Sequence, residues 1–195
     1  MASSKLSFGP VLACLGLVWL GGCATSSKPQ QMTIAADVAQ PLTPGARGYH
    51  RFGVGEIGGG SETEPIGLSQ VSNDALRLAL TNSMANLGYL ADDKSHAAYR
   101  VSATIVELDR PGAVYDPVLI LVPVDLSVTA RIHYTVKPAD GGPALFDEVV
   151  ATTGTASVDE AISPNGRVRK ANEAAIRLNI ATFLKRLQSG LHRDG

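Results

Sequence analysis

Cysteine is almost missing from this chain of 195 residues: its two copies, Cys14 and Cys23, both lie near the N-terminus. Residues 24–195 therefore contain no thiol nucleophile, no disulfide and no cysteine ligand for a metal. Tryptophan is equally scarce, with one copy at Trp19. The stability of the body must come from burial of aliphatic side chains, and the 45% hydrophobic content is typical of a chain that forms a compact core.

A strong net charge is also absent, since 17 basic and 18 acidic residues leave a formal charge of −1. Proteins that bind nucleic acid carry a basic surface, so this composition argues against nucleic acid as a partner. The four histidines show no metal-ligand spacing, and neither H-E-x-x-H nor G-x-S-x-G occurs. We therefore expect no metal, no cofactor and no enzymatic activity.

Gly53, Gly55 and Gly58 match the pattern G-x-G-x-x-G. A dinucleotide site needs these glycines in a turn between a strand and an immediately following helix. Here they lie within a predicted strand, residues 49–57, and a polar loop follows. The match therefore predicts a glycine face that lets another backbone approach closely, not a nucleotide site.

The N-terminal segment has the pattern of a secretory signal: Lys5, an apolar run over residues 8–20, and the small residues Gly21 and Gly22 before Cys23. The run is too short for a transmembrane helix, which needs about 20 apolar residues. A plain secretory signal would leave Cys23 as an unpaired thiol in an oxidising compartment. Both alternatives are therefore disfavoured.

Residues 20–23, Leu-Gly-Gly-Cys, resemble the bacterial lipobox. The resemblance implies diacylglyceryl transfer to the Cys23 sulfur, cleavage after Gly22 and acylation of the new N-terminus. Residues 1–22 are then a signal peptide, and the mature chain attaches to a membrane through acylated Cys23. In enterobacterial lipoproteins an Asp after the cysteine favours inner-membrane retention. Ala24 lacks that signal, which implies a periplasm-facing location on the outer membrane.

Residues 24–48 are rich in Ser, Thr, Gln, Pro and Gly. This composition predicts that residues 23–48 are the lipidated cysteine and a flexible tether, whose coil would span about 27 Å. The folded body is then residues 49–190.

Within the body the pattern predicts strands over residues 49–57, 99–109, 125–137 and 144–156. It predicts one helix over residues 73–87, with Ser72 as N-cap and Gly88 as stop, and a second over 167–188, ended by Gly190. Residues 125–137 alternate between apolar and polar, which indicates one buried and one solvated face. The predicted fold class is α+β: a two-layer sandwich with a mostly antiparallel sheet of about four strands and two helices on one face.

The apolar run at residues 115–124 does not alternate and occupies a connection between two strands, where polar residues are expected. One interpretation is a strand extension that covers the core. The other is an exposed hairpin tip that enters a partner protein or a membrane surface. In the second case the contact residues are Val118, Leu119, Ile120, Leu121 and Val122.

Arg167, Arg169 and Lys170 lie near the start of the last helix, where the helix dipole disfavours cations. A solvated face is one explanation. The other is a contact with an anionic, phosphate-bearing lipid such as phospholipid or lipopolysaccharide.

Over residues 50–188, the order of the predicted strands and helices and their sequence pattern resemble the LPS-assembly lipoprotein that plugs a β-barrel translocon. The resemblance lies in Ser72-Asn73-Asp74-Ala75-Leu76, Ala98-Tyr99-Arg100-Val101 and Ala171-Asn172-Glu173-Ala174-Ala175. Auxiliary lipoproteins of lipid-transporting ABC systems share a similar order.

These resemblances imply a non-enzymatic outer-membrane lipoprotein that acts as an adaptor in cell-envelope assembly, with an outer-membrane β-barrel or an envelope transporter as partner. The alternative is a lipid-trafficking accessory that binds phospholipid or lipopolysaccharide. A lipid carrier needs an internal apolar cavity, whereas an adaptor has a filled core and an external apolar patch.

Overall fold

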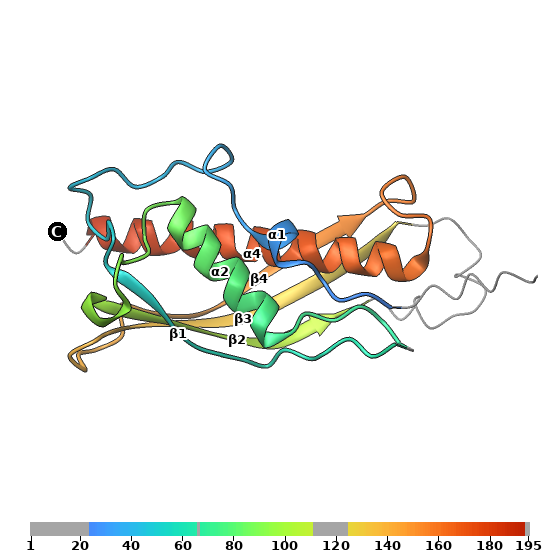
Figure 1. The fold of residues 1–195 in the computed structure, drawn as a ribbon, viewed down its shortest axis with the longest axis horizontal. Coiled ribbons are helices and arrows are strands. Elements are labelled where there is room, and N and C mark those ends of the chain that lie inside the picture. Colours follow the sequence, from blue (N-terminus) through green and yellow to red (C-terminus); the bar gives the residue numbers. More distant parts are fainter. Residues whose placement is uncertain (1–23, 66, 111–124, 194–195) are drawn as a thin grey trace, which may run out of the picture.

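A computed structural model describes residues 24–65, 67–110 and 125–193 of the chain. The elements in order are α1 (Pro29–Met32), β1 (Phe52–Gly58), α2 (Asn73–Asn86), a 3-10 turn η1 (Lys94–His96), β2 (Tyr99–Asp109), β3 (Leu126–Pro138), β4 (Phe146–Ala156) and α4 (Pro164–Arg193) (Figure 1). No helix in the described part of the chain is long and apolar enough to cross a membrane.

The four strands form one sheet in the order β1-β2-β3-β4. β2 pairs with β3, and β3 with β4, in antiparallel register. These pairs confirm the predicted four-stranded, mostly antiparallel sheet. β1 pairs with β2 in parallel, because α2 returns the chain to the end of the sheet at which β1 began.

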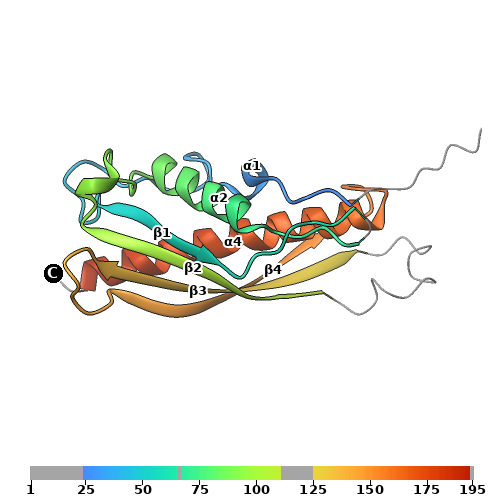
Figure 2. The same cartoon turned by 60° about the horizontal axis from the view of Figure 1, so that its bottom comes forward.

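Both long helices cover the same face of the sheet, α2 against β1 and α4 against β3 and β4 (Figure 2). Residues of β3 alternate between fully buried side chains on this face and half-buried or exposed ones on the other. Polar pairs occupy the uncovered face, where Ser127 bonds Thr155 at 3.0 Å and Thr129 bonds Thr153 at 2.9 Å. The predicted two-layer sandwich with one bare sheet face is confirmed.

Aromatic side chains fill the space between α4 and the sheet. Tyr134 of β3 stacks on Phe183 of α4, with ring centroids 4.1 Å apart and planes within 2°. Phe146 of β4 meets the same ring edge-on at 5.3 Å. Such pairs contribute about 0.5–1.5 kcal/mol beyond their burial. The core at this point is therefore filled by side chains.

The predicted capping of α2 is confirmed. The Ser72 hydroxyl accepts the Ala75 amide at 3.2 Å, and Gly88 after the helix has a φ of +74°. The amide of Tyr89 then bonds the carbonyl of Met84 at 2.8 Å, which completes the C-terminal turn. The helix ends at Asn86, one residue before the predicted end.

Helix α4 is longer than predicted, at 30 residues from Pro164 to Arg193, and it does not end at Gly190. Leu191 beyond the glycine is 4% exposed, and its carbonyl accepts Arg47 Nη1 at 3.2 Å. These tertiary contacts keep the helix intact past a residue that would otherwise favour its end. At 1.5 Å per residue the helix spans about 45 Å and runs the length of the molecule (Figure 1).

Candidate functional site

The first candidate site is the end of the body at which the described chain begins. The Ala24 amide approaches the Pro65 carbonyl at 3.4 Å, and the Ser27 amide donates to the Gln70 carbonyl at 3.1 Å. The Ser27 and Ser69 hydroxyls lie 3.5 Å apart. The chain is therefore attached to the loop before α2 from its first described residues.

Helix α4 provides a second set of contacts with the same segment. The Lys28 amide donates to Glu173 Oε1 at 2.9 Å, and Arg169 Nη1 donates to the Thr25 hydroxyl at 2.6 Å. The side chain of Glu173 is only 4% exposed, and Arg169 Nε lies 3.7 Å from its carboxylate. A buried carboxylate is costly without partners, so this amide and guanidinium are what make its burial tolerable.

Residues 32–34 continue the packing along α2. Met32 is completely buried and Ile34 is 2% exposed. The Ile34 amide donates to the Ser83 hydroxyl at 2.9 Å, and Asn86 Nδ2 donates to the Ile34 carbonyl at 2.9 Å. The predicted flexible tether over residues 24–48 is therefore wrong: this segment is part of the folded body, because Met32, Ile34 and Leu42 enter the core.

The three cations predicted to contact an anionic lipid do not converge. Arg167 is 3% exposed, and its Nη1 donates to the carbonyls of Ala161 and Ile162 at 3.2 and 2.9 Å. Arg169 binds Thr25 and faces Glu173. Lys170 lines a small hollow of about 120 Å³ that also contains Glu160. The prediction of a lipid contact is thus wrong for Arg167, whose guanidinium holds the preceding loop.

Cys23 and the predicted partner contacts Val118, Leu119, Ile120, Leu121 and Val122 lie outside the described residues. Arg110 and Asp125 flank the apolar run, and Arg110 Nη2 bonds Gln70 Oε1 at 2.6 Å. Gln70 also accepts the Ser27 amide through its carbonyl. Arg110 therefore lies at the same end of the body as residues 24–28.

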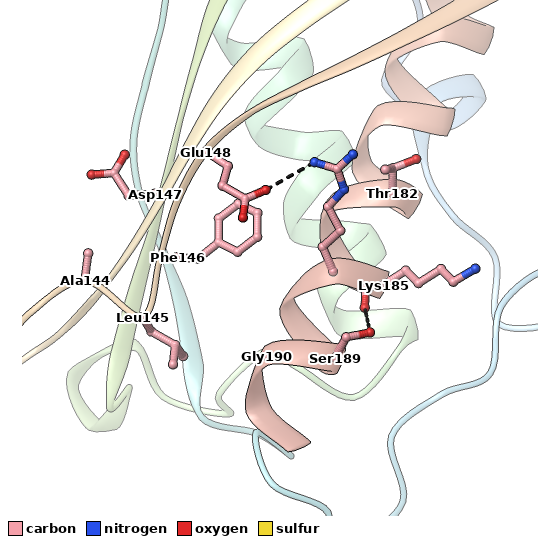
Figure 3. Close-up of a pocket in the computed structure, with 10 residues that line it drawn as sticks. Ala144, Leu145, Phe146, Asp147, Glu148, Thr182, Lys185, Ser189 and Gly190 are labelled. Carbon is pink, nitrogen blue, oxygen red and sulfur yellow. Dashed lines mark hydrogen bonds and ion pairs between the residues drawn. The ribbon is translucent and has the colours of Figure 1, made fainter. Parts of the chain in front are cut away.

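The second candidate site is an open groove at the other end of the molecule, with a volume of about 770 Å³. Residues 144–148, at the start of β4, and residues 182–190, in the C-terminal half of α4, form its walls (Figure 3). Phe146 lies at its base, and Arg186 Nη1 pairs with Glu148 Oε2 across it at 3.2 Å. The remaining lining residues are Ala144, Leu145, Asp147, Thr182, Lys185, Ser189 and Gly190.

The groove borders the outer edge of β4, which among the described strands has a neighbour on one side only. Residues 149–156 of this strand carry no charge and no proline, the usual protections of an exposed edge. At the opposite edge of the sheet, β1 is covered: Phe52 bonds Tyr89 through its amide at 3.0 Å, and Arg77 Nη1 bonds the Gly55 carbonyl at 2.7 Å. The β1 edge of the sheet is therefore covered by other parts of the chain, whereas the β4 edge lacks charge and proline over residues 149–156.

A smaller hollow of about 280 Å³ lies between Ala39, Leu87 and Leu184. Its volume falls just below the usual range for ligand pockets, about 300–1,000 Å³. The layer between sheet and helices is filled by fully buried side chains, including Tyr134, Phe183 and Ile180. At the positions of these side chains the layer between sheet and helices is therefore filled.

No family model matches the chain, and no curated protein matches its sequence. Protein XCC0632 from Xanthomonas campestris, solved under the family model DUF330, matches in structure with a TM-score of 0.52 at 10% identity, covering 79% of this chain and 92% of that chain. The two proteins share a fold. A candidate lipoprotein from Caulobacter crescentus CB15 matches with a TM-score of 0.46 at 14% identity, covering 63% and 85% of the two chains. At such identities the likeness to XCC0632 shows the fold alone.

The groove was missed by the sequence analysis for a physical reason. Its walls come from residues 144–148 and 182–190, which meet only because α4 packs along β4. The acidic pair Asp147-Glu148 and the basic pair Lys185-Arg186 were the only available signal. Opposite charges in two amphipathic elements are too common to predict a groove.

Proposed function

We propose that this protein is a lipid-anchored lipoprotein of the outer membrane that acts by binding, as an adaptor in cell-envelope assembly. The anchor is acylated Cys23, supported by the signal-like N-terminal sequence and the Leu-Gly-Gly-Cys pattern at residues 20–23. The binding element is the groove between β4 and α4. This groove lies at the start of an edge strand whose residues 149–156 carry no charge and no proline, and it is the observation that carries the proposal.

The chemistry of the groove favours an extended segment of a partner protein. A peptide can add a strand to the free edge of β4 and gain main-chain hydrogen bonds, while its side chains enter the adjacent hollow. Phe146 supplies an apolar base, whereas Lys185 and the Glu148–Arg186 pair supply polar contacts at the rim. The partner expected from the sequence is an outer-membrane β-barrel or an envelope transporter.

The filled layer between sheet and helices supports an adaptor over a lipid carrier. Side chains such as Tyr134, Ile176 and Phe183 are completely buried where a carrier would hold acyl chains. The apolar run at residues 118–122 stays a second proposed contact, with a partner or with lipid. Arg110, the last described residue before this run, bonds Gln70 at the end of the body opposite the groove.

Photo-crosslinking in living cells tests the proposal. A photoreactive residue at Thr182 lines the groove, and one at Thr129, on the bare sheet face and away from the groove, is the matched control. We expect one envelope protein to crosslink to position 182 and not to 129, and the double substitution Lys185→Glu and Arg186→Glu to reduce that product.

Three outcomes have distinct meanings. Equal products at positions 182 and 129, or none at 182, contradict docking in the groove. A protein adduct from a photoreactive residue at Leu119 instead would move the contact to the apolar run. A lipid adduct at either position would favour the lipid-trafficking alternative.

A further inference from the structure

The structure leaves almost no free chain between the lipidation site and the folded body. Cys23 is bonded directly to Ala24, and adjacent Cα atoms are about 3.8 Å apart. Ala24 already contacts the Pro65 carbonyl, and Thr25, Ser27 and Lys28 are all held by the body. A flexible tether of 25 residues would have allowed a separation of about 27 Å.

We propose that the end of the molecule formed by residues 24–28, 67–70 and 157–163, here called the anchor face, lies directly against the lipid headgroups. This inference rests on the proposed lipid anchor at Cys23. A body linked to its acyl chains by one residue cannot stand away from the bilayer. The partner of the anchor face is therefore the phospholipid surface in which those chains are inserted.

The link between Cys23 and the body is short, and its direction is also fixed, because residues 25–28 bond to two separate elements. Arg169 and Glu173 on α4 hold Thr25 and Lys28, while Gln70 in the loop before α2 holds Ser27. Contacts on two elements prevent the segment from turning about a single bond. The body is thus oriented with the N-terminal end of α4 toward the membrane.

The anchor face presents an apolar side chain to this surface. Ile162, in the loop before α4, is 92% exposed, whereas Val168 in the first turns of that helix is 1% exposed. The buried guanidinium of Arg167 bonds the carbonyls of Ala161 and Ile162 and so holds the loop in place. An exposed isoleucine on a fixed loop is suited to insertion between headgroups.

Charge does not drive this contact. Lys28, Arg169 and Lys170 at this end are matched by the acids Glu160 and Glu173, and Asp159 is also present. A basic patch that would select anionic lipid is therefore not formed by these residues. The orientation follows from the covalent link and from Ile162.

The proposal places the groove away from the membrane. Thr182 to Gly190 follow Arg169 by 13 to 21 positions on α4, which corresponds to roughly 20–30 Å along the helix axis. Figure 1 shows the N-terminal segment and the C-terminal end of α4 at opposite ends of the molecule. A partner could reach the groove without entering the headgroup layer.

Spin labels on the full-length lipoprotein in liposomes of phosphatidylethanolamine and phosphatidylglycerol test the orientation. One label replaces Ile162, and the matched control replaces Asp140 in the turn between β3 and β4 at the far end. We expect the label at 162 to lose most of its accessibility to an aqueous nickel complex and to gain oxygen accessibility, while the label at 140 stays fully water-accessible.

A second variant carries about 20 flexible Gly and Ser residues between Ala24 and Thr25, which restores a reach of roughly 25 Å. We expect the label at 162 to become water-accessible in this variant. Mass spectrometry of the N-terminal peptide tests the lipid anchor at Cys23 separately from the orientation of the body. An acylated chain with a water-exposed label at 162 overturns the orientation alone, whereas a chain without acyl mass on Cys23 overturns both the anchor and the orientation.

Discussion

Three buried polar side chains of α4 show how single residues position the fold. Glu173 accepts the Lys28 amide, Asn172 Nδ2 donates to the Ser69 carbonyl at 2.9 Å, and Asn179 Nδ2 donates to the Val150 carbonyl at 2.8 Å. Each binds the backbone of a different segment: the N-terminal chain, the loop before α2 and β4. Buried polar groups of this kind are costly unless paired, so they favour one arrangement of the segments.

None of these roles was visible in the sequence. A polar residue on an amphipathic helix normally indicates the solvated face, and Glu173 among basic neighbours fits that pattern. Arg167 shows the reverse error, since its charge predicts a ligand contact while its guanidinium bonds Ala161 and Ile162. Which polar side chains are buried depends on chain segments far away in sequence.

Gly154 of β4 gives a sharp prediction at this scale. A Cβ at this position would lie 2.2 Å from the Ala175 amide nitrogen and 2.5 Å from the Ala171 carbonyl oxygen. Both atoms are helix backbone and cannot move without displacing α4. We expect Gly154→Ala to destabilise the protein by several kcal/mol, at or above the usual range of about 1–3 kcal/mol for overpacking, as measured by urea denaturation.

Gly190→Ala on α4 is the matched control. A Cβ there meets no atom within 4 Å, and Gly190 lies inside the helix. We expect this change to stabilise the protein by about 0.5–1 kcal/mol, because alanine loses less backbone entropy than glycine in a helix. Equal effects of the two substitutions would contradict the close approach of α4 to β4.

At the scale of elements, prediction succeeded where the local signals agree. Helix α2 has a serine cap, an apolar stripe and a glycine stop, and β3 alternates without a break over 13 residues. The prediction for the N-terminal segment was wrong because its composition is that of a linker. Only a few apolar residues, such as Met32 and Ile34, attach it to the core. Burial of those side chains needs the surfaces of α2 and α4, which local pattern does not contain.

A substitution at Ser83 tests how the N-terminal segment, residues 24–48, is attached to the body. It accepts the Ile34 amide at 2.9 Å and donates to the Ala79 carbonyl at 2.7 Å, in a fully buried position. Ser83→Ala leaves the Ile34 amide without this partner, which costs about 1–3 kcal/mol for a buried donor. We expect faster proteolytic cleavage within residues 24–48 than in the wild-type protein.

Thr81→Ala on the same helix is the control, since Thr81 is half-buried and lies two residues before the contact. It changes a hydroxyl on α2 without removing the bond to Ile34. Cleavage of the Ser83 variant at the wild-type rate would show that the bond between Ser83 and Ile34 contributes nothing to holding the segment.

At the scale of the whole molecule, the two candidate sites lie at opposite ends of one long helix. The proposed lipid anchor could be inferred from the sequence, because residues 20–23 resemble a motif contained in one short peptide. The groove does not, because its two walls meet only through the packing of α4 on β4. A motif within a single peptide can thus be proposed from sequence alone, whereas a concave surface shared by distant elements cannot.

Two buried tyrosines make the free energy of unfolding depend on pH under alkaline conditions. Burial raises the pKa of the Tyr89 phenol to about 12, and it raises the pKa of Tyr134 well above its usual range. The folded chain therefore keeps protons that the unfolded chain releases above pH 10. The unfolded state binds fewer protons in this window, so the free energy of unfolding falls as pH rises.

We expect full stability below about pH 10 and a loss of roughly 2–3 kcal/mol from Tyr89 between pH 10 and 12, with a further loss from Tyr134. Urea denaturation at a series of pH values measures this loss in the free energy of unfolding. Tyr134→Phe is the informative variant, because the Tyr134 hydroxyl has no partner among the described residues while its ring stacks on Phe183.

The phenylalanine variant keeps that stacking and removes a buried, unpaired hydroxyl, so its stability at pH 8 should equal or exceed that of the wild type. Above pH 10 its free energy of unfolding should fall less steeply, because only Tyr89 then contributes a strongly shifted phenol. A variant that loses more than about 1 kcal/mol at pH 8 would show that the hydroxyl has a partner, and an unchanged alkaline slope would show that Tyr134 is accessible to water.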